Sequence, residues 1–171
     1  MGTGICYVFG GGERTDCTIT FEKEDLVIAA DAGFDYLNDL GLRADVVLGD
    51  FDSVISYDLP SDSLRYPKEK DDTDMMLALK LGLERGYTEF RIYGGMGGRL
   101  EHTLANLQCL IYLKQCSAVG YLMDDKTTAF VMQNETVWFK PEAKGFLSLF
   151  SLGEKASGVT IRNLKYEMQD G

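Results

Sequence analysis

The sequence predicts an α/β fold, with an open, largely parallel sheet and flanking helices in its amino-terminal part and a β-sandwich-like domain after it. Two observations predict this fold. Up to residue 117, short apolar runs alternate with segments of helical periodicity, which is the pattern of parallel strands joined by helices. From residue 118 onward, short apolar runs follow one another with turn residues between them, as in an all-β unit. We therefore expect two domains, 1–117 and 118–171.

The composition indicates a compact globular protein and weighs against two classes of function. The 171 residues are 45% hydrophobic and 11% aromatic, which is enough for a sizeable core. The formal net charge of −10 weighs against a general nucleic-acid or membrane-surface role, because such roles need a basic footprint. Four cysteines without a CxxC pair predict free thiols rather than disulfides or zinc ligands. With no signal peptide or membrane-length apolar run, we expect a cytoplasmic protein.

The first two predicted strands end in small or acidic residues. The strand over 4–9 runs into Gly10-Gly11-Gly12, and a glycine turn after a buried strand lets the backbone approach a phosphate closely. This turn matches neither a GxGxxG nor a Walker pattern, so an ordinary turn is the alternative. The strand over 26–30 ends in Asp31-Ala32-Gly33, and a short helix is predicted over 34–40.

The third predicted strand, 46–48, delivers two carboxylates together. It runs into Gly49-Asp50-Phe51-Asp52-Ser53, where alternation along an extended chain puts Asp50 and Asp52 on the same side. Two carboxylates aimed at one point repel unless a cation lies between them, and Mg²⁺ is a hard ion that shares its oxygen ligands with substrate phosphates. A β-turn with solvated aspartates is the alternative. Because three successive strands end in glycine or aspartate, we expect one cleft at the carboxyl ends of the strands.

A second acidic cluster, Lys70-Asp71-Asp72-Thr73-Asp74, precedes a helix predicted over 75–85. One of Asp71, Asp72 or Thr73 is expected to cap this helix, and the helix dipole favours acids in its first turn. Capping alone does not need three aspartates after a lysine. We therefore expect carboxylates here to hold a metal ion or its water, and Lys70 to contact a phosphate oxygen.

The strand predicted over 89–93 leads into Gly94-Gly95-Met96-Gly97-Gly98, four glycines in five residues. Glycines at this density remove the side chains that keep a ligand away from the backbone, at an entropy cost to the fold. We expect the N–H groups of this loop, opening a helix over 101–114, to cradle phosphate oxygens, with Arg99 as a bidentate partner. His102, the only histidine, is expected to contact either a carboxylate or the substrate.

Taken together, these segments resemble the thiamine pyrophosphokinase family. The resemblance rests on Asp31-Ala32-Gly33, Gly49-Asp50-Phe51-Asp52-Ser53, Lys70-Asp71-Asp72-Thr73-Asp74 and Gly94-Gly95-Met96-Gly97-Gly98-Arg99-Leu100-Glu101-His102, in this order and spacing. It continues through 146–150 and 158–166 and so covers nearly the whole chain. That family transfers the pyrophosphoryl group of ATP to the hydroxyl of thiamine and releases AMP. The resemblance implies the same activity here, with Mg²⁺ as cofactor and ATP as co-substrate.

The resemblance also implies a role for each matching residue. The implied catalytic acids are Asp50, Asp52, Asp71 and Asp74, with Asp74 or Asp71 accepting the proton of the hydroxyl. The implied metal ligands are Asp50, Asp52, Asp74 and Glu101, the last standing where the family usually has an aspartate. The implied substrate and nucleotide contacts are Asp31, Ser53, Lys70, Thr73, Gly97, Gly98, Arg99, His102 and Tyr166.

The carboxyl-terminal part is expected to be a β-rich, thiamine-binding and dimerisation domain. Its predicted strands are 118–123, 128–132, 136–139, 145–150 and 158–161. The resemblance implies a homodimer with thiamine held between the α/β part of one subunit and the sandwich of the other. The family continues past the segment matching Tyr166 with a Ser-Asn motif, so we expect this domain to be incomplete at its carboxyl end. Tyr166 either stacks on the thiamine pyrimidine or is an ordinary edge-strand tyrosine.

Two other functions fit the same acidic residues. One is a different Mg²⁺-dependent enzyme acting on phosphate esters, which releases phosphate from ATP without thiamine. The other is a nucleotide- or thiamine-binding sensor without catalysis, which the replacement of the family aspartate by Glu101 favours.

Overall fold

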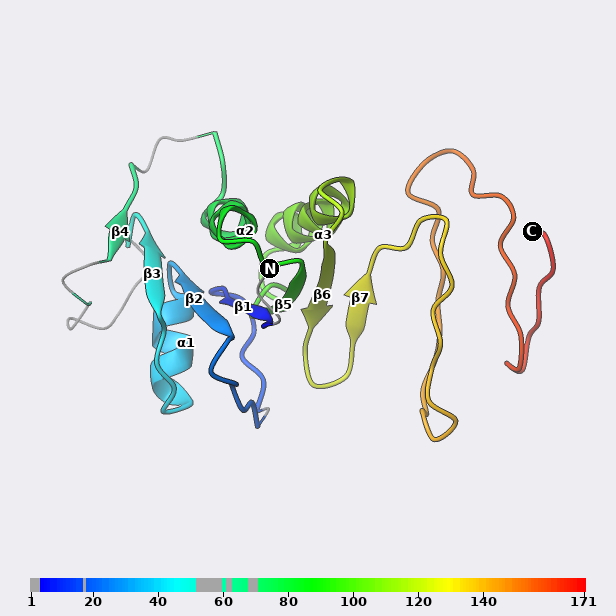
Figure 1. Cartoon of the computed structure of the whole chain (residues 1–171), viewed down its shortest axis with the longest axis horizontal. Coiled ribbons are helices and arrows are strands. Elements are labelled where there is room, and N and C mark those ends of the chain that lie inside the picture. The colour runs from blue at the N-terminus through cyan, green and yellow to red at the C-terminus, as the bar shows by residue number, and fades with distance from the viewer. Residues whose placement is uncertain (1–3, 17, 52–59, 61–62, 68–70) are drawn as a thin grey trace. The chain divides into compact units, whose positions relative to one another are not determined.

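The computed structural model describes residues 4–16, 18–51, 60, 63–67 and 71–171. Within them lies one seven-stranded sheet with the order β4-β3-β2-β1-β5-β6-β7 (Figure 1). Neighbouring strands from β4 to β6 are parallel, and β7 pairs antiparallel with β6. The predicted largely parallel α/β sheet is therefore confirmed. The strands are β1 (Cys6–Phe9), β2 (Leu26–Ala30), β3 (Val46–Gly49), β4 (Leu64–Arg65), β5 (Glu89–Tyr93), β6 (Val119–Met123) and β7 (Thr128–Phe130).

Helices cover both faces of this sheet. Helices α2 (Asp74–Glu84) and α3 (Leu100–Gln115) lie on one face, and α1 (Gly33–Asp39) lies on the other (Figure 1). The central strand β1 serves both layers because its side chains alternate between the faces. Cys6 and Val8 belong to the apolar core under α2 and α3, whereas Tyr7 and Phe9 belong to the core under α1. No helix among the described residues is long and apolar enough to cross a membrane.

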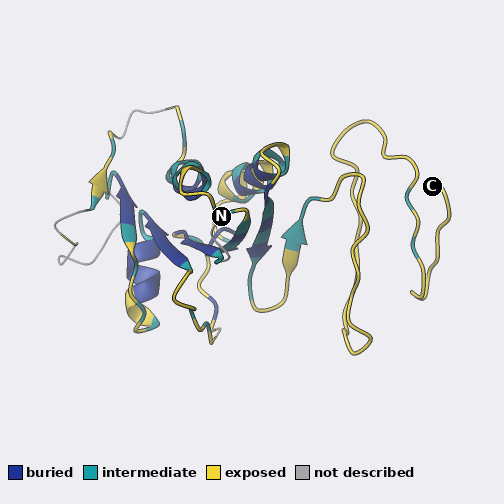
Figure 2. Ribbon diagram, viewed as in Figure 1, coloured by how far each residue is buried: buried dark blue, intermediate teal, exposed yellow. Residues whose placement is uncertain are grey.

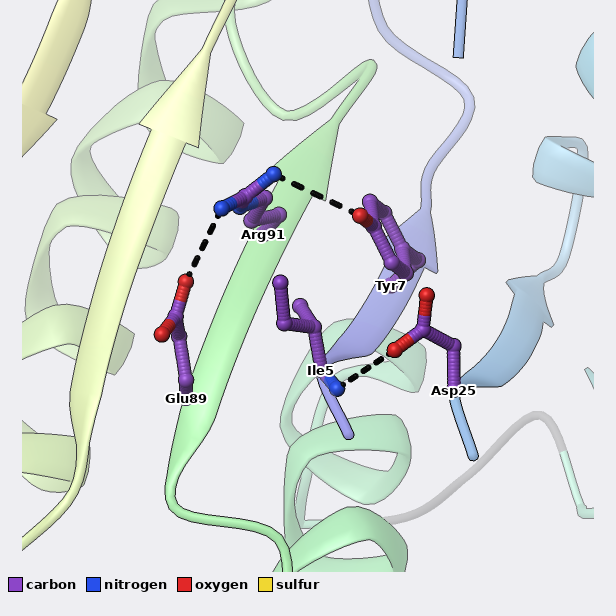
Figure 3. Close-up of polar contacts among 5 residues, drawn as sticks. All are labelled: Ile5, Tyr7, Asp25, Glu89 and Arg91. Atoms are coloured by element: carbon purple, nitrogen blue, oxygen red, sulfur yellow. Dashed lines mark hydrogen bonds and ion pairs between the residues drawn. The ribbon is translucent and has the colours of Figure 1, made fainter. Parts of the chain in front are cut away.

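Strands β1 and β2 are buried along their whole length, as expected for parallel strands covered on both faces (Figure 2). Polar contacts brace the amino-terminal half of these strands (Figure 3). The backbone N–H of Ile5 donates to Asp25 Oδ1 at 2.8 Å, which ties the start of β1 to β2. Arg91 on β5 donates to Glu89 Oε1 at 3.1 Å and to the Tyr7 hydroxyl at 3.4 Å. Burial raises the pKa of this tyrosine. None of these contacts involves the residues that follow the carboxyl ends of the strands.

The predicted strands 118–123 and 128–132 are present, but they lie in the same sheet as β1 to β5. Strand β6 pairs in parallel with β5, and β7 closes the sheet edge as a hairpin. Strand β6 joins this sheet because it packs under α3. Gly120 and Leu122 of β6 are buried, and Gly120 lies against Leu110 and Leu113 of α3. The chain divides into compact units at Met1–Glu135 and Thr136–Gly171, so this hairpin belongs to the first unit.

The second unit, Thr136–Gly171, contains a short antiparallel ladder. Its pairing is the bridge between Ile161 and Met168, extended by hydrogen bonds between Val159 and Gly171. The predicted β-sandwich is not confirmed in this unit. A sandwich buries apolar side chains between two sheets, whereas Trp138 and Phe150 are 86% and 85% exposed here. That a sandwich-like domain binds thiamine stays a prediction.

The cysteines of the described residues are free, as predicted. Cys6 and Cys109 are buried, and burial raises their pKa values to about 12 and about 11. Both are therefore neutral thiols at physiological pH and behave as small apolar core residues. Cys116 is exposed, and Cys17 lies outside the described residues.

Candidate active site at the carboxyl ends of the strands

Two aspartates that were predicted as site residues follow directly on adjacent parallel strands. Asp31 comes after β2 and Asp50 comes after β3, and the register aligns Ala30 with Leu48. The N–H of Asp31 donates to the carbonyl of Leu48 at 2.8 Å, which joins the two strand ends. A Cβ on Gly49 would lie 3.1 Å from the Cα of Asp31, so a glycine permits this close approach. Both carboxylates therefore start from one edge of the sheet.

The central strand β1 lies at the point where the strand order reverses. From β1 the chain proceeds through β2, β3 and β4 on one side, and through β5 and β6 on the other. Open α/β sheets bind ligands at such a point, outside the carboxyl ends of the strands. The residues that follow β1 and β5 are Gly10–Gly12, called here the first glycine loop, and Gly94–Gly98, called the second glycine loop.

The two glycine loops are hydrogen-bonded to each other and their neighbours. Gly10 N–H donates to the carbonyl of Tyr93 at 2.8 Å, and Gly12 N–H donates to the carbonyl of Gly94 at 2.7 Å. A Cβ on Gly12 would lie 2.5 Å from that same carbonyl oxygen, which is closer than real atoms approach. From the sequence, the first glycine loop fits either a ligand-binding loop or an ordinary turn. Its hydrogen bond to Gly94 places it beside the second glycine loop, whereas ligand binding by either loop stays a prediction.

The residues of the acidic segment 71–74 make different contacts. Thr73 is the N-cap of α2, and its hydroxyl oxygen accepts a hydrogen bond from the N–H of Met76 at 3.2 Å. Asp72, which precedes the cap, forms an ion pair with Lys80 of α2 at 2.5 Å. Thr73 is therefore the capping residue among the three predicted candidates. Asp72 has a structural role in the ion pair with Lys80. Asp71 is exposed before the cap, and Asp74 lies in the first turn of α2. A ligand-binding role for these two acids stays a prediction.

Replacing Thr73 by alanine is expected to lower the free energy of unfolding by about 1 kcal/mol, because the cap hydroxyl is lost. Urea denaturation measures this loss. Thr73→Ser is the matched control, since serine keeps a capping oxygen and should stay within about 0.5 kcal/mol of the parent. Equal stability of the alanine and parent proteins would contradict the capping role.

The second glycine loop ends at Arg99, which is the N-cap residue of α3 and contributes no side-chain cap. Instead, Arg99 Nε and Nη2 each approach Glu101 Oε1 at 2.7 Å. The pKa of Glu101 is lowered, first by its own backbone N–H and then by the Arg99 guanidinium. Both side chains are more than half exposed, so this ion pair is weak and open to competition by another anion.

His102 lies in the first turn of α3, one residue after Glu101. Its backbone N–H donates to the carbonyl of Arg99 at 3.2 Å, and the residue is exposed. Its predicted contact with a carboxylate or the substrate stays a prediction. Tyr166 belongs to the second unit, where it is 77% exposed and Lys165 Nζ lies 5.4 Å from its ring centroid.

Three predicted site residues, Asp52, Ser53 and Lys70, lie outside the described residues. Within the described part of the chain, no group of three or more histidine, cysteine, aspartate or glutamate side chains is arranged to hold a metal ion. The donors that are described fit magnesium by their chemistry, because Asp50 and Asp74 offer carboxylate oxygens, the ligands this ion prefers. The magnesium site therefore stays a prediction that depends on Asp52.

Two further residues contact the second glycine loop and were not among the predicted ligand-binding residues. Glu13 lies across the second glycine loop: its N–H donates to the carbonyl of Met96 at 2.9 Å, and a Cβ on Gly97 would lie 2.4 Å from its side chain. Asn106 of α3 is buried and donates from Nδ2 to the carbonyl of Gly95 at 2.7 Å. In the sequence, Asn106 stands one helical turn after His102 on the same helix face, whereas no pattern points to Glu13.

Comparison with known proteins shows a sequence family that this chain matches. Residues 17–120 match the family model described as thiamin pyrophosphokinase, catalytic domain, and this range is more than half of the 171 residues. The thiamine pyrophosphokinase of Bacillus subtilis (strain 168) is 29% identical over 174 residues, which cover 95% of this chain and 81% of that protein.

Solved structures of similar proteins share the fold. A thiamine pyrophosphokinase from Bacillus subtilis aligns with a TM-score of 0.63 and 30% identity, covering 71% of this chain and 61% of that one. A thiamin pyrophosphokinase from Geobacillus thermodenitrificans aligns with a TM-score of 0.60 and 28% identity, covering 72% and 61%. A thiamin pyrophosphokinase family protein from Enterococcus faecalis aligns with a TM-score of 0.60 and 27% identity, and the alignment covers 74% of this chain and 63% of that one. In each alignment, this chain spans less than two thirds of the solved chain.

Proposed function

Because the chain belongs to the thiamin pyrophosphokinase catalytic-domain family, we propose that it transfers the pyrophosphoryl group of ATP to the hydroxyl of thiamine, giving thiamine diphosphate and AMP. The observation that carries this proposal is the pairing of two glycine loops where the strand order reverses. Backbone N–H groups in such loops bind phosphate oxygens, and Asp31 and Asp50 follow neighbouring strands at the same edge of the sheet.

The reaction we propose is a direct in-line transfer. The hydroxyl oxygen of thiamine forms a bond to the β-phosphorus of ATP, the bond from that phosphorus to the oxygen of AMP breaks, and AMP leaves with its electron pair. Asp74 or Asp71 accepts the hydroxyl proton. No covalent enzyme intermediate is needed, which agrees with the neutral, buried thiols of Cys6 and Cys109.

The residues that would hold Mg²⁺ are Asp50, Asp52, Asp74 and Glu101. When bound, this ion neutralises charge on the triphosphate, which is the main requirement of phosphoryl transfer. Arg99 would bind phosphate oxygens through its planar guanidinium. We propose that a phosphate displaces Glu101 from Arg99, because an exposed ion pair is weak. The freed Glu101 carboxylate is then available to the metal.

Further ligand contacts are part of the same proposal. The remaining proposed contacts to ATP or thiamine are Asp31, Ser53, Lys70, Thr73, Gly97, Gly98, His102 and Tyr166. For Thr73 the capping bond to Met76 already accounts for the hydroxyl, so a ligand would share it. A homodimer in the cytoplasm, with residues 118–171 completing the thiamine site, is part of the same proposal.

The test is to incubate the protein with ATP, Mg²⁺ and thiamine and to measure AMP and thiamine diphosphate. Equal amounts of both products, dependent on thiamine, are expected. Phosphate release from ATP in the absence of thiamine would identify a different phosphate-ester enzyme. Nucleotide or thiamine binding without AMP would identify a sensor. Either outcome would overturn the proposed transfer.

A further inference from the structure

Three successive carbonyl groups of the second glycine loop each accept a hydrogen bond from elsewhere in the chain. The carbonyl of Gly94 accepts from Gly12 N–H at 2.7 Å, and that of Met96 accepts from Glu13 N–H at 2.9 Å. The carbonyl of Gly95, between them, accepts from the side-chain amide of Asn106 at 2.7 Å. Two of these donors are backbone groups, which a substitution does not remove. Asn106 is the one donor of the three that is a side chain.

These three bonds set the direction of the neighbouring N–H groups. The described peptide bonds are all trans, and in a trans peptide the C=O and the following N–H point in opposite directions. The N–H of Gly95 therefore points away from Gly12, that of Met96 away from Asn106, and that of Gly97 away from Glu13. A loop that binds an anion through N–H groups must have its carbonyl oxygens turned away from that anion. Each donor holds one carbonyl group in place and thereby fixes the opposite direction for the N–H group that follows it.

Asn106 is placed so that its amide has little freedom. It is 8% exposed in the second turn of α3, and a Cβ on Gly95 would lie 3.3 Å from its Nδ2 and 2.5 Å from Leu122 Cδ1. A buried amide without a partner is costly, so the bond to Gly95 defines the rotamer of Asn106 as well as the orientation of the loop. The contact joins α3 to the loop across eleven residues of sequence.

We propose that Asn106 is a positioning residue for phosphate binding: by holding the carbonyl of Gly95, it keeps the N–H of Met96 directed toward the triphosphate. This inference rests on the proposed function of the second glycine loop as the phosphate-binding loop. It assigns Asn106 no contact with ATP, thiamine or the metal. This positioning role differs from a role in the stability of α3, because the hydrogen bond from Asn106 orients a peptide group of the loop and not one of the helix.

The test compares Asn106→Asp and Asn106→Ser with the parent protein. The aspartate has the shape of asparagine but, when ionised, no N–H, so it repels the Gly95 carbonyl; the serine removes the amide without adding charge or volume. Isothermal titration calorimetry with MgATP, and separately with inorganic tripolyphosphate, measures binding without turnover. Loss of one buried hydrogen bond predicts roughly tenfold weaker binding of both ligands.

Gln108→Asp is the matched control, because it places the same negative charge on an exposed position of the same helix. It should bind both ligands within about twofold of the parent, since an exposed charge is well screened. In an active enzyme, the Asn106 variants should raise the KM for ATP more than they lower kcat.

Thermal unfolding of each variant separates positioning from folding. Folded Asn106 variants with parental affinity for MgATP and tripolyphosphate would overturn the proposal, and so would a failure of both variants to fold, which would make Asn106 a folding residue. If the parent protein binds MgATP but forms no thiamine diphosphate, the proposed transfer fails while this binding test stands.

Discussion

An Asp50→Asn variant is expected to lose on the order of a thousandfold in kcat/KM for thiamine diphosphate formation, since metal-held charge contributes several kcal/mol to such transition states. Asp50 follows β3 at the edge where both glycine loops lie, and asparagine keeps its shape while removing its charge. The effect should appear mainly in kcat, because negative charge develops on the leaving oxygen of AMP only as the transfer proceeds. The rate of AMP and thiamine diphosphate formation over a range of Mg²⁺ concentrations measures it.

Asp125→Asn provides the matched control for Asp50. Asp125 lies in the turn between β6 and β7, and its side chain is 55% exposed and 3.7 Å from Lys126 Nζ. This variant should keep parental activity and the parental Mg²⁺ dependence, since it removes a solvated charge. An Asp50→Asn protein with activity within about threefold of the parent at every Mg²⁺ concentration would contradict a metal-binding role for Asp50.

The strand ends of the site could be predicted from the sequence because each signal is local. An apolar run followed by aspartate or glycine marks the end of a buried strand, and Asp31, Asp50 and Gly94 do follow β2, β3 and β5. Parallel pairing then brings these ends to one edge. For the cap of α2 the sequence offers three candidates, and geometry selects Thr73, whose hydroxyl accepts from the N–H of Met76.

The contacts between distant segments could not be predicted in this way. Gly12 and Gly94 meet through the pairing of β1 with β5, and residue types near Gly12 carry no signal for that partner. The short runs of β6 and β7 have a strand pattern, but periodicity does not say which sheet a strand joins. The burial of Gly120 against Leu110 and Leu113 of α3 decides it.

The pairing of the glycine loops gives the second large expected effect: Gly94→Ala should lower the free energy of unfolding by about 3 kcal/mol or more. Gly94 has a φ of +61°, in the left-handed region that costs an alanine about 1–2 kcal/mol. In addition, its Cβ would lie 2.3 Å from the carbonyl oxygen of Gly10. That contact is to backbone, which cannot move aside as a flexible side chain can. Urea denaturation measures the loss.

Gly41→Ala separates the two causes, because Gly41 has nearly the same backbone conformation, with a φ of +67°, and no described atom beyond its chain neighbours lies within 4 Å of where the alanine methyl would stand. It should lose only the conformational contribution, about 1–2 kcal/mol. The difference in stability loss between the two variants then measures the overlap with Gly10, and equal losses would contradict the close approach of the loops.

If the Gly94 variant folds, its affinity for MgATP should fall as well, because separating the loops turns the peptide groups that Gly12 and Asn106 hold. Stability and phosphate binding are thus expected to fail together at Gly94, whereas at Asn106 binding should fail in a protein that still folds.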